Sequence, residues 1–287
     1  MLRSVAILAL ALQTSAPATF DSNRAWEHLR RLVAIGPRPA GSPAIENTRK
    51  YIKEQLAASG LTTVDQAWDD RTPLGTVHMV NLIATIPGAS KNRLVIAGHY
   101  DTKKFREFPF VGANDGGSSA AFLIELARVL KNRTNALTIE ILFLDGEEAV
   151  LEWQGNDHTY GSRHYVETAK RDGSLASLKA MILVDMIGDR DLKMRRDLNS
   201  TAWLTNLIWE TARARQLSAY FINETTQIED DHEEFLRVGI PAVDIIDLDF
   251  PAWHTAADTL DSVSARSLQV VGDVLLAALP QIETRLK

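Results

Sequence analysis

Apolar residues recur at helical spacing in the first part of the chain, and two short apolar runs follow. Helices are expected over residues 23–35, which end at a Gly-Pro-Arg-Pro sequence, and over residues 44–59, which end at Gly60. The apolar runs, residues 80–86 and 94–97, are rich in β-branched and aliphatic residues and flank a Pro-Gly pair. They are expected to form two strands that pair with each other around a turn.

From residue 119 onward, amphipathic stretches alternate with short apolar runs. Helices are expected over residues 119–130, 162–169, 201–215 and 265–279, and strands over residues 137–144, 181–184 and 243–246. Apolar strands that alternate with amphipathic helices are typical of a mostly parallel sheet covered on both faces. The pattern predicts an α/β fold, a three-layer sandwich with helices on either side of a central sheet.

Length and composition agree with one globular domain over residues 19–287. The chain has 287 residues, of which 45% are hydrophobic and 24% charged, so collagen-like, low-complexity and largely disordered classes are excluded. It shows no internal repeat and no Pro-rich linker that would divide it. The formal net charge of −6 disfavours a nucleic-acid partner, because phosphate binding relies on a basic surface.

The beginning of the chain resembles an export signal. An apolar run over residues 5–12 follows Arg3 and precedes the small-residue sequence Ala16-Pro17-Ala18. The run is shorter than the roughly 20 apolar residues that a membrane-spanning helix needs, so no stable membrane anchor is expected. Residues 1–18 are interpreted as a signal peptide of a periplasmic or secreted bacterial protein.

Candidate metal ligands follow the predicted strands. His99, the pair Glu147-Glu148, Asp185 and His254 each lie just beyond a predicted strand or in the loop after it. In sheets of this kind, ligands bind beyond the carboxyl ends of the strands. The chain has no cysteine, so a bound metal must be held by histidine and carboxylate side chains. The sequence therefore predicts a site at this edge of the sheet.

Several candidate residues also have a simpler structural interpretation. His99 alone is compatible with a buried, hydrogen-bonded histidine. Asp115 is compatible with an N-cap of the following helix. Glu147 and Glu148 are compatible with a solvated acidic turn. However, a strongly apolar strand places these two carboxylates at the predicted crevice, where they repel each other unless a cation or a shared proton intervenes. A bound cation is the simplest explanation.

Three of the residues form a donor set suited to catalytic zinc. Asp115, Glu148 and His254 would supply two oxygens and one nitrogen, which leaves a coordination position open for water or substrate. His99 and Asp185 would complete a second metal site or act as outer partners of the first.

Several segments are similar to the zinc aminopeptidase family typified by bacterial leucyl aminopeptidase, namely His99-Tyr100-Asp101 and residues 112–115, 145–149 and 253–255. Others narrow the resemblance to its cyclising branch, the animal-type glutaminyl-peptide cyclotransferases: Glu147-Glu148-Ala149 followed by Trp153, Tyr160-Gly161-Ser162-Arg163-His164, Asp230-Asp231-His232, and Phe250-Pro251. The similarity extends over residues 36–261.

The resemblance implies a fold, a reaction and a set of roles. The reaction is attack of an N-terminal glutamine's α-amine on its own side-chain amide, which gives pyroglutamate and ammonia. The substrates are peptide or protein N-termini that begin with glutamine. The implied roles are zinc binding by Asp115, Glu148 and His254, proton transfer by Glu147 beside the Asp185 and Asp230 carboxylate pair, and glutamine side-chain binding by Trp153, Phe250 and Trp253.

The chain departs from the animal pattern in three places. Two residues separate Phe250 from Trp253, one fewer than in the animal enzymes, and Gly116-Gly117 after Asp115 is more similar to the peptidases. The cysteine pair common in animal members is missing, which affects stability more than chemistry.

An alternative function keeps the same fold. All five ligand types of the two-zinc peptidases are present, namely His99, Asp115, Glu148, Asp185 and His254. One zinc ion is expected, but a two-zinc aminopeptidase in which Glu147 activates a metal-bridging water is the alternative. Trp153 and the Asp230 segment favour cyclisation. A non-catalytic binding domain is disfavoured because every expected ligand is present. The sequence gives no indication of an oligomeric state.

Overall fold

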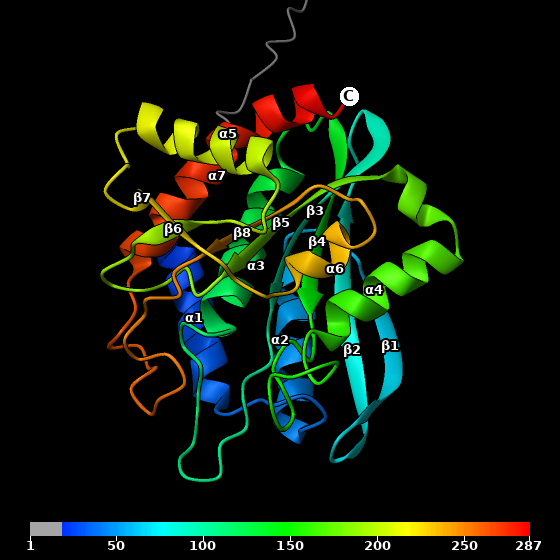
Figure 1. Ribbon diagram of the computed structural model, residues 1–287, viewed down its shortest axis with the longest axis vertical. Helices are drawn as coiled ribbons and strands as arrows, with labels where there is room; N and C mark the ends of the chain where they lie inside the picture. Colours follow the sequence, from blue (N-terminus) through cyan, green and yellow to red (C-terminus); the bar gives the residue numbers. More distant parts are fainter. Residues whose placement is uncertain (1–18) are drawn as a thin grey trace, which may run out of the picture.

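A six-stranded sheet forms the centre of the computed structural model, which describes residues 19–287 (Figure 1). The predicted signal peptide, residues 1–18, lies outside the described residues. The sheet has the strand order β1-β2-β4-β3-β5-β8. The strands are β1 (Thr63–Thr72), β2 (Gly75–Ile86), β3 (Ser90–His99), β4 (Leu137–Leu144), β5 (Leu178–Asp185) and β8 (Ala242–Ile246). The last four in spatial order are parallel, and β1 and β2 add an antiparallel edge.

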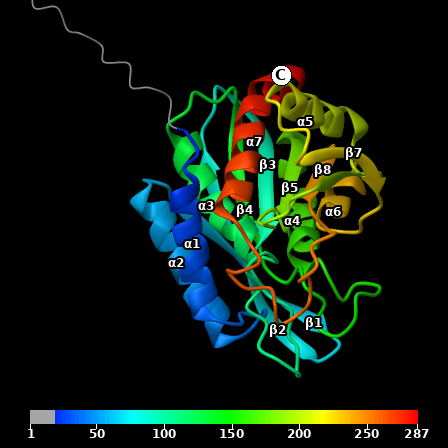
Figure 2. The same cartoon turned by 90° about the vertical axis from the view of Figure 1, so that its left-hand side faces the viewer.

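Helices cover both faces of the sheet, as the two views show (Figures 1 and 2). One face carries α1 (Ser22–Ile35), α2 (Pro43–Ala58), α3 (Gly117–Lys131), α5 (Ala202–Ala214) and α7 (Ala265–Arg285). The other carries α4 (Tyr160–Arg171), the short 3-10 helix η1 (Ser174–Ser177) and α6 (His232–Leu236). The predicted three-layer α/β sandwich with a mostly parallel sheet is confirmed.

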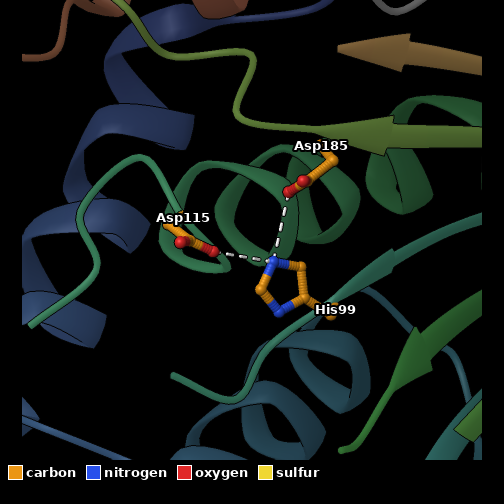
Figure 3. A group of neighbouring side chains, drawn as sticks. All are labelled: His99, Asp115 and Asp185. Atoms are coloured by element: carbon orange, nitrogen blue, oxygen red, sulfur yellow. Dashed lines mark hydrogen bonds and ion pairs between the residues drawn. The ribbon is translucent and has the colours of Figure 1, made fainter. Parts of the chain in front are cut away.

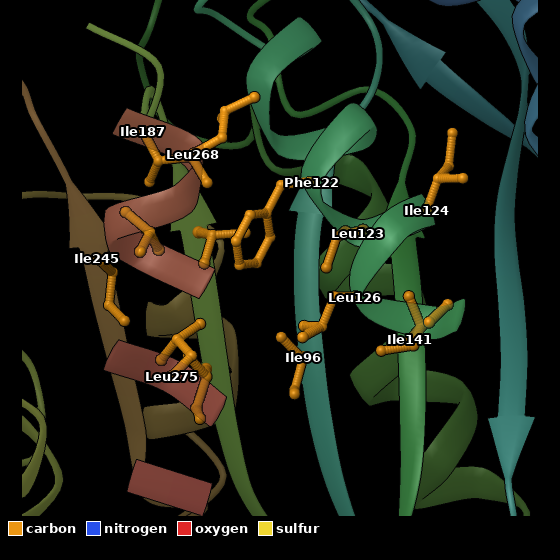
Figure 4. Packing of buried hydrophobic residues seen from close by; sticks show 14 of the residues in the cluster. Ile96, Phe122, Leu123, Ile124, Leu126, Ile141, Ile187, Ile245, Leu268 and Leu275 are labelled. Atoms are coloured by element: carbon orange, nitrogen blue, oxygen red, sulfur yellow. The ribbon is translucent and has the colours of Figure 1, made fainter. Parts of the chain in front are cut away.

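The two faces of the sheet belong to two hydrophobic clusters. In β3, Ile96 packs into the cluster beneath α3 and α7 (Figure 4). Its neighbour Val95 packs into the cluster beneath α4. In β4, Ile141 and Leu142 divide in the same way. Successive strand residues point to opposite faces, so a strand that is buried on both sides must be apolar throughout. This is why these strands appear in the sequence as continuous apolar runs.

The predicted pairing of residues 80–86 with residues 94–97 is wrong. Both segments are strands, but β4 lies between them, antiparallel to β2 and parallel to β3. The connection between β2 and β3 crosses the start of β4, because the backbone N–H groups of Ala89 and Ser90 donate to the carbonyls of Asn135 and Ala136. A local turn signal shows that the chain reverses, but it does not show which strand inserts beside it.

Several elements escaped the sequence analysis. Strand β1 carries mostly polar side chains at the sheet edge, so it lacks an apolar pattern. The short strands β6 (Met194–Asp197) and β7 (Phe221–Thr226) form a separate two-stranded sheet, and α6 has only five residues. The predicted helices match observed ones, although α7 extends to Arg285 beyond Pro280. Within residues 19–287, no helix is long and apolar enough to span a membrane.

Candidate active site

A cavity of about 570 Å³ lies beyond the carboxyl ends of the parallel strands. Residues from the loops after β3, β4, β5 and β8 line it, together with residues 227–230 between β7 and α6. The lining includes most of the site residues predicted from the sequence, namely Asp115, Glu147, Glu148, Trp153, Asp185, Asp230, Trp253 and His254. The structure therefore places these residues where the sequence predicted them, beyond the carboxyl ends of the strands.

The predicted zinc ligands come together. Nε2 of His254 lies 3.3 Å from Oδ2 of Asp115 and 3.5 Å from Oε1 of Glu148. One ligand atom from each of the three residues lies within 4.8 Å of the others. Oδ2 of Asp115 is buried and has no hydrogen-bond partner among residues 19–287. A buried carboxylate oxygen without a partner is costly, and a cation would satisfy it.

A second cluster shares Asp115 with the first (Figure 3). Nε2 of His99 lies 3.1 Å from Oδ1 of Asp185 and 3.2 Å from Oδ1 of Asp115. All three residues are buried, and one ligand atom from each again lies within 4.8 Å of the others. The two oxygens of Asp115 therefore face different histidines, so this carboxylate connects the two clusters.

Asp115 does not cap α3. The helix begins after Gly116, and no side-chain hydrogen bond caps it among the described residues, so the N-cap interpretation is wrong. Instead, Asp258 accepts hydrogen bonds from the backbone N–H groups of Asn114 (2.7 Å) and Asp115 (3.1 Å). Gly116 has a φ of +73°, and a Cβ there would lie 2.4 Å from the carbonyl oxygen of Asp101. The tight turn therefore requires glycine, and Asp258 fixes it.

Two further buried residues hold the loops that carry the ligands. Asp101 accepts hydrogen bonds from the backbone N–H groups of Glu147 (3.2 Å) and Glu148 (3.4 Å). The guanidinium of Arg38 is fully buried and donates to three backbone carbonyls within residues 100–112. Burial lowers the pKa of Arg38 to about 10, so it remains protonated at neutral pH. Carboxylates and the guanidinium thus fix the backbone on either side of the ligands.

Glu147 and Asp230 are buried acids that line the cavity. Burial raises the pKa of Glu147 well above its usual value, and the nearby carboxylate of Asp230 adds to this rise. Burial likewise raises the pKa of Asp230, with a further contribution from Asp185. Oε2 of Glu147 lies 3.7 Å from Nδ1 of His99. A carboxyl group with a raised pKa holds its proton more readily than a solvated one, which is the property a general acid needs.

Two tryptophans form the exposed rim of the cavity. Trp153 is 38% exposed and Trp253 is 43% exposed, and both line the cavity. The Trp253 ring stacks on His254 with a centroid distance of 4.5 Å, and the Trp153 ring stacks on His158 at 4.2 Å. The sequence analysis gave His158 no role, whereas the structure places it beneath the Trp153 ring.

Phe250 lies in a different place from the one predicted. It is 3% exposed and packs in a small cluster behind the cavity wall, with Met186, Ile228, Ile246 and Ala252. The backbone N–H of Trp253 donates to the carbonyl of Phe250 across a tight turn. The short connection between the two rings therefore separates them, with Trp253 at the cavity and Phe250 supporting its wall.

The residues that hold the ligands in place had no role predicted from the sequence. Asp101, Asp258 and Arg38 are buried and contact backbone groups around the site. Lys103 donates its backbone N–H to Glu148 and its ammonium group to the carbonyl of Ala149. Asp101 and Asp258 each lie within four residues of a candidate ligand, which was the available signal.

Comparisons with known proteins identify the family of the chain. Residues 81–279 match the model of Peptidase family M28. The chain is 34% identical to a glutaminyl-peptide cyclotransferase-like protein of Mus musculus, over 83% of this chain and 70% of that protein. It is 30% identical to a glutaminyl-peptide cyclotransferase of Drosophila melanogaster, over 80% of this chain and 73% of that protein. The crystal structure of an Acidobacteriales bacterium glutaminyl cyclase superposes with a TM-score of 0.88 at 38% identity, over 97% of this chain and 100% of that chain. The chain therefore belongs to Peptidase family M28.

Proposed function

We propose that this protein is a glutaminyl-peptide cyclotransferase, which converts the N-terminal glutamine of peptides and proteins into pyroglutamate and releases ammonia. The observation that carries the proposal is a buried Glu147 beside the Asp115, Glu148 and His254 cluster, in a cavity with a tryptophan rim. Relatives and solved structures named as glutaminyl cyclases support cyclisation over the aminopeptidase alternative.

The ligand cluster fits a zinc ion. We propose one zinc per chain, held by Asp115, Glu148 and His254, because an O, O, N donor set with an open side is typical of catalytic zinc. When bound, zinc polarises the side-chain amide carbonyl and stabilises the negative charge that develops on its oxygen. His99 and Asp185 then act as outer partners of the site.

The metal count has a direct test. With one zinc per chain, metal analysis of the purified protein gives one equivalent, and His99→Ala retains it. A second equivalent that His99→Ala loses would instead assign His99, Asp115 and Asp185 to a second metal site.

The side chains of the cavity account for the reaction. The α-amine nitrogen of the substrate forms a bond to its own side-chain amide carbon. Glu147 takes a proton from the attacking nitrogen and returns it to the amide nitrogen, whose bond to that carbon then breaks, so that ammonia leaves. Asp185 and Asp230 accept hydrogen bonds from the leaving nitrogen, and burial together with the charge of Asp185 raises the pKa of Asp230.

The tryptophan rim positions the glutamine side chain of the substrate. Both reacting groups belong to one residue, so the enzyme needs chiefly to hold the glutamine side chain folded back on its own amine. Trp153 and Trp253 offer flat apolar surfaces that favour this folded form. The reaction consumes no water.

An activity assay tests the proposed function. The zinc-loaded protein is incubated with a glutamine-initiated peptide, with the same peptide acetylated at its N-terminus, and with a leucine anilide. We expect ammonia and a pyroglutamyl peptide from the first substrate only, because acetylation removes the nucleophile. Release of anilide without ammonia would identify an aminopeptidase and overturn the proposal.

We further propose that residues 1–18 are removed on export to the periplasm or the exterior of a bacterial cell. The small-residue sequence before residue 19 supports this interpretation. Mass analysis of the protein recovered from a bacterial periplasm is expected to show loss of the N-terminal segment. Recovery of the full-length chain from the cytoplasm alone would contradict it.

A further inference from the structure

The sequence Tyr160-Gly161-Ser162-Arg163-His164 lies at the start of α4, between two walls of the cavity. One wall is residues 149–158, named here the tryptophan loop because it carries Trp153. The other is residues 227–231, named here the aspartate segment because it carries Asp230. None of the five residues of this sequence lines the cavity, yet their side chains contact both walls.

Tyr160 closes the tryptophan loop through Asp157. The Asp157 carboxylate accepts hydrogen bonds from the backbone N–H groups of residues 150–152, at distances between 2.8 and 3.2 Å. The hydroxyl of Tyr160 donates to the same carboxylate at 2.7 Å. Three consecutive amides and one hydroxyl on a single carboxylate fix the shape of a loop that has no other regular structure.

Arg163 holds the far end of the same loop. Its guanidinium donates to the backbone carbonyls of His158 (3.2 Å) and Asn156 (3.0 Å) and lies over the Tyr160 ring. The ring of His158 stacks on Trp153 with an interplanar angle of 11°. The orientation of the Trp153 ring therefore follows from backbone that Arg163 anchors.

Ser162 contacts the opposite wall. Its hydroxyl donates to Oδ1 of Asp231 at 2.5 Å. Asp231 is fully buried, and its backbone N–H donates to Oδ1 of Asp230. A serine on α4 thus determines where the carboxylate next to Asp230 lies, and through the backbone it sets the orientation of Asp230 itself.

The start of α4 is attached directly to the turn that carries Glu147. The backbone N–H groups of Thr159 and Tyr160 donate to the carbonyls of Glu147 and Gly146, both at 2.8 Å. At Gly161, a Cβ would lie 2.6 Å from the carbonyl oxygen of Asp145, so only glycine allows this approach. The two walls and Glu147 are therefore held from one point.

We propose that Tyr160, Ser162 and Arg163 are positioning residues that set Trp153 and Asp230 on opposite sides of the reacting glutamine. The inference rests on the proposed function for its kinetic consequences, but its structural part is independent of it. Tyr160 and Arg163 act on substrate binding through Trp153. Ser162 acts on the chemical step through Asp230.

Kinetics of single variants test this division. Loss of one hydrogen bond to a charged group changes an equilibrium constant by roughly tenfold. Tyr160→Phe is therefore expected to raise KM about tenfold and to keep kcat within about twofold. Ser162→Ala is expected to lower kcat about tenfold with KM within about twofold. Arg163→Gln is a second variant for the tryptophan loop and is expected to behave as Tyr160→Phe does.

Tyr165→Phe is the matched control. Tyr165 lies on the same helix, and its hydroxyl donates to a buried carboxylate of Glu140, in the middle of β4 and outside the cavity lining. This variant loses a hydrogen bond of the same kind and is expected to leave KM and kcat unchanged. An equal rise in KM for Tyr165→Phe and Tyr160→Phe would show a general loss of stability, and would overturn the inference.

Amide hydrogen exchange provides a readout that does not depend on activity. In Tyr160→Phe, exchange is expected to accelerate over residues 150–152 and to stay unchanged over residues 229–232; in Ser162→Ala, the reverse is expected. Equal acceleration of both walls in both variants, or of neither, would overturn the inference. If each variant accelerates exchange in only its own wall but the protein does not cyclise glutamine, the inference stands and the proposed function is rejected.

Discussion

The floor of the cavity and its rim are built differently. The floor is formed by Asp115, Glu147, Glu148, Asp185 and Asp230, which are buried acids at strand ends or in the loops that follow strands. Hydrogen bonds accepted by Asp101 and Asp258 and donated by Arg38 hold the backbone around these acids. The rim consists of tryptophans that are 38% and 43% exposed, lie on loops, and are oriented by ring stacking. In the proposed function, the chemistry therefore depends on buried side chains with anchored backbone, whereas recognition depends on exposed rings that stacking orients.

This difference predicts how variants divide. A change in the floor alters charge or proton transfer among buried groups, where electrostatic effects are large. A change in the rim removes apolar contact area, whose loss is moderate and falls mainly on binding.

Glu147→Gln tests the floor most severely. The amide keeps the shape of the side chain but cannot carry the proton, so kcat is expected to fall roughly 1000-fold, within the range for general acid–base catalysis. Zinc content is expected to stay unchanged, because Glu147 is adjacent to the metal cluster and outside it. Glu148→Gln, by comparison, is expected to lose zinc. Unchanged turnover or loss of zinc in Glu147→Gln would show that its role is misassigned.

Asp258→Asn tests the support of the floor. One of its oxygens then becomes an amide that cannot accept the backbone N–H groups of Asn114 and Asp115 together. Zinc affinity is expected to fall about 10- to 100-fold, as for other outer partners of metal sites. Asp261→Asn is the control, since Asp261 is exposed. Equal zinc affinities of the two variants in a chelator titration would contradict the role of Asp258.

Trp153→Ala tests the rim. Loss of the ring removes a binding surface, so KM for a glutamine-initiated peptide is expected to rise about tenfold with little change in kcat. Trp153→Phe keeps an aromatic face and is expected to recover most of the loss. A fall in kcat as large as that of Glu147→Gln would mean that the rim takes part in the chemical step, and the division between floor and rim would fail.

His28 provides a test far from the cavity. It lies in α1, is 8% exposed, and burial lowers its pKa to about 4. Because the unfolded chain binds the proton more readily, the free energy of unfolding falls as pH drops from about 6.5 to 4, by up to roughly 3 kcal/mol. His28→Gln is expected to flatten this dependence in thermal unfolding while kinetics at neutral pH stay unchanged. An identical pH dependence in both proteins would contradict it.

The sequence predicted the floor better than the rim, for a physical reason. Parallel strands that are buried on both faces leave long apolar runs, and their carboxyl ends must meet at one edge, so His99, Glu148 and Asp185 could be placed together. The same argument gave the three-layer fold. It failed where order in space departs from order along the chain, as when β4 inserts between β2 and β3.

Loop geometry carried little signal in the sequence. Phe250 and Trp253 are three residues apart, and only the turn between them shows that one is buried and the other faces the cavity. His158 and Asp157 act through stacking and backbone contacts, which leave no periodic pattern. Strand β1 is polar because it lies at an edge, so its pairing with β2 was invisible to an apolar pattern.

The central claim is that this cavity joins the α-amine of a glutamine to its own side chain. A peptide with a heavy nitrogen isotope in the side-chain amide of its N-terminal glutamine tests it in one mass spectrum. The account predicts that the label leaves as ammonia and that the peptide keeps all its residues but loses the mass of one ammonia. Labelled free glutamine, or a peptide that has gained an oxygen in place of the labelled nitrogen, would show hydrolysis and contradict the account.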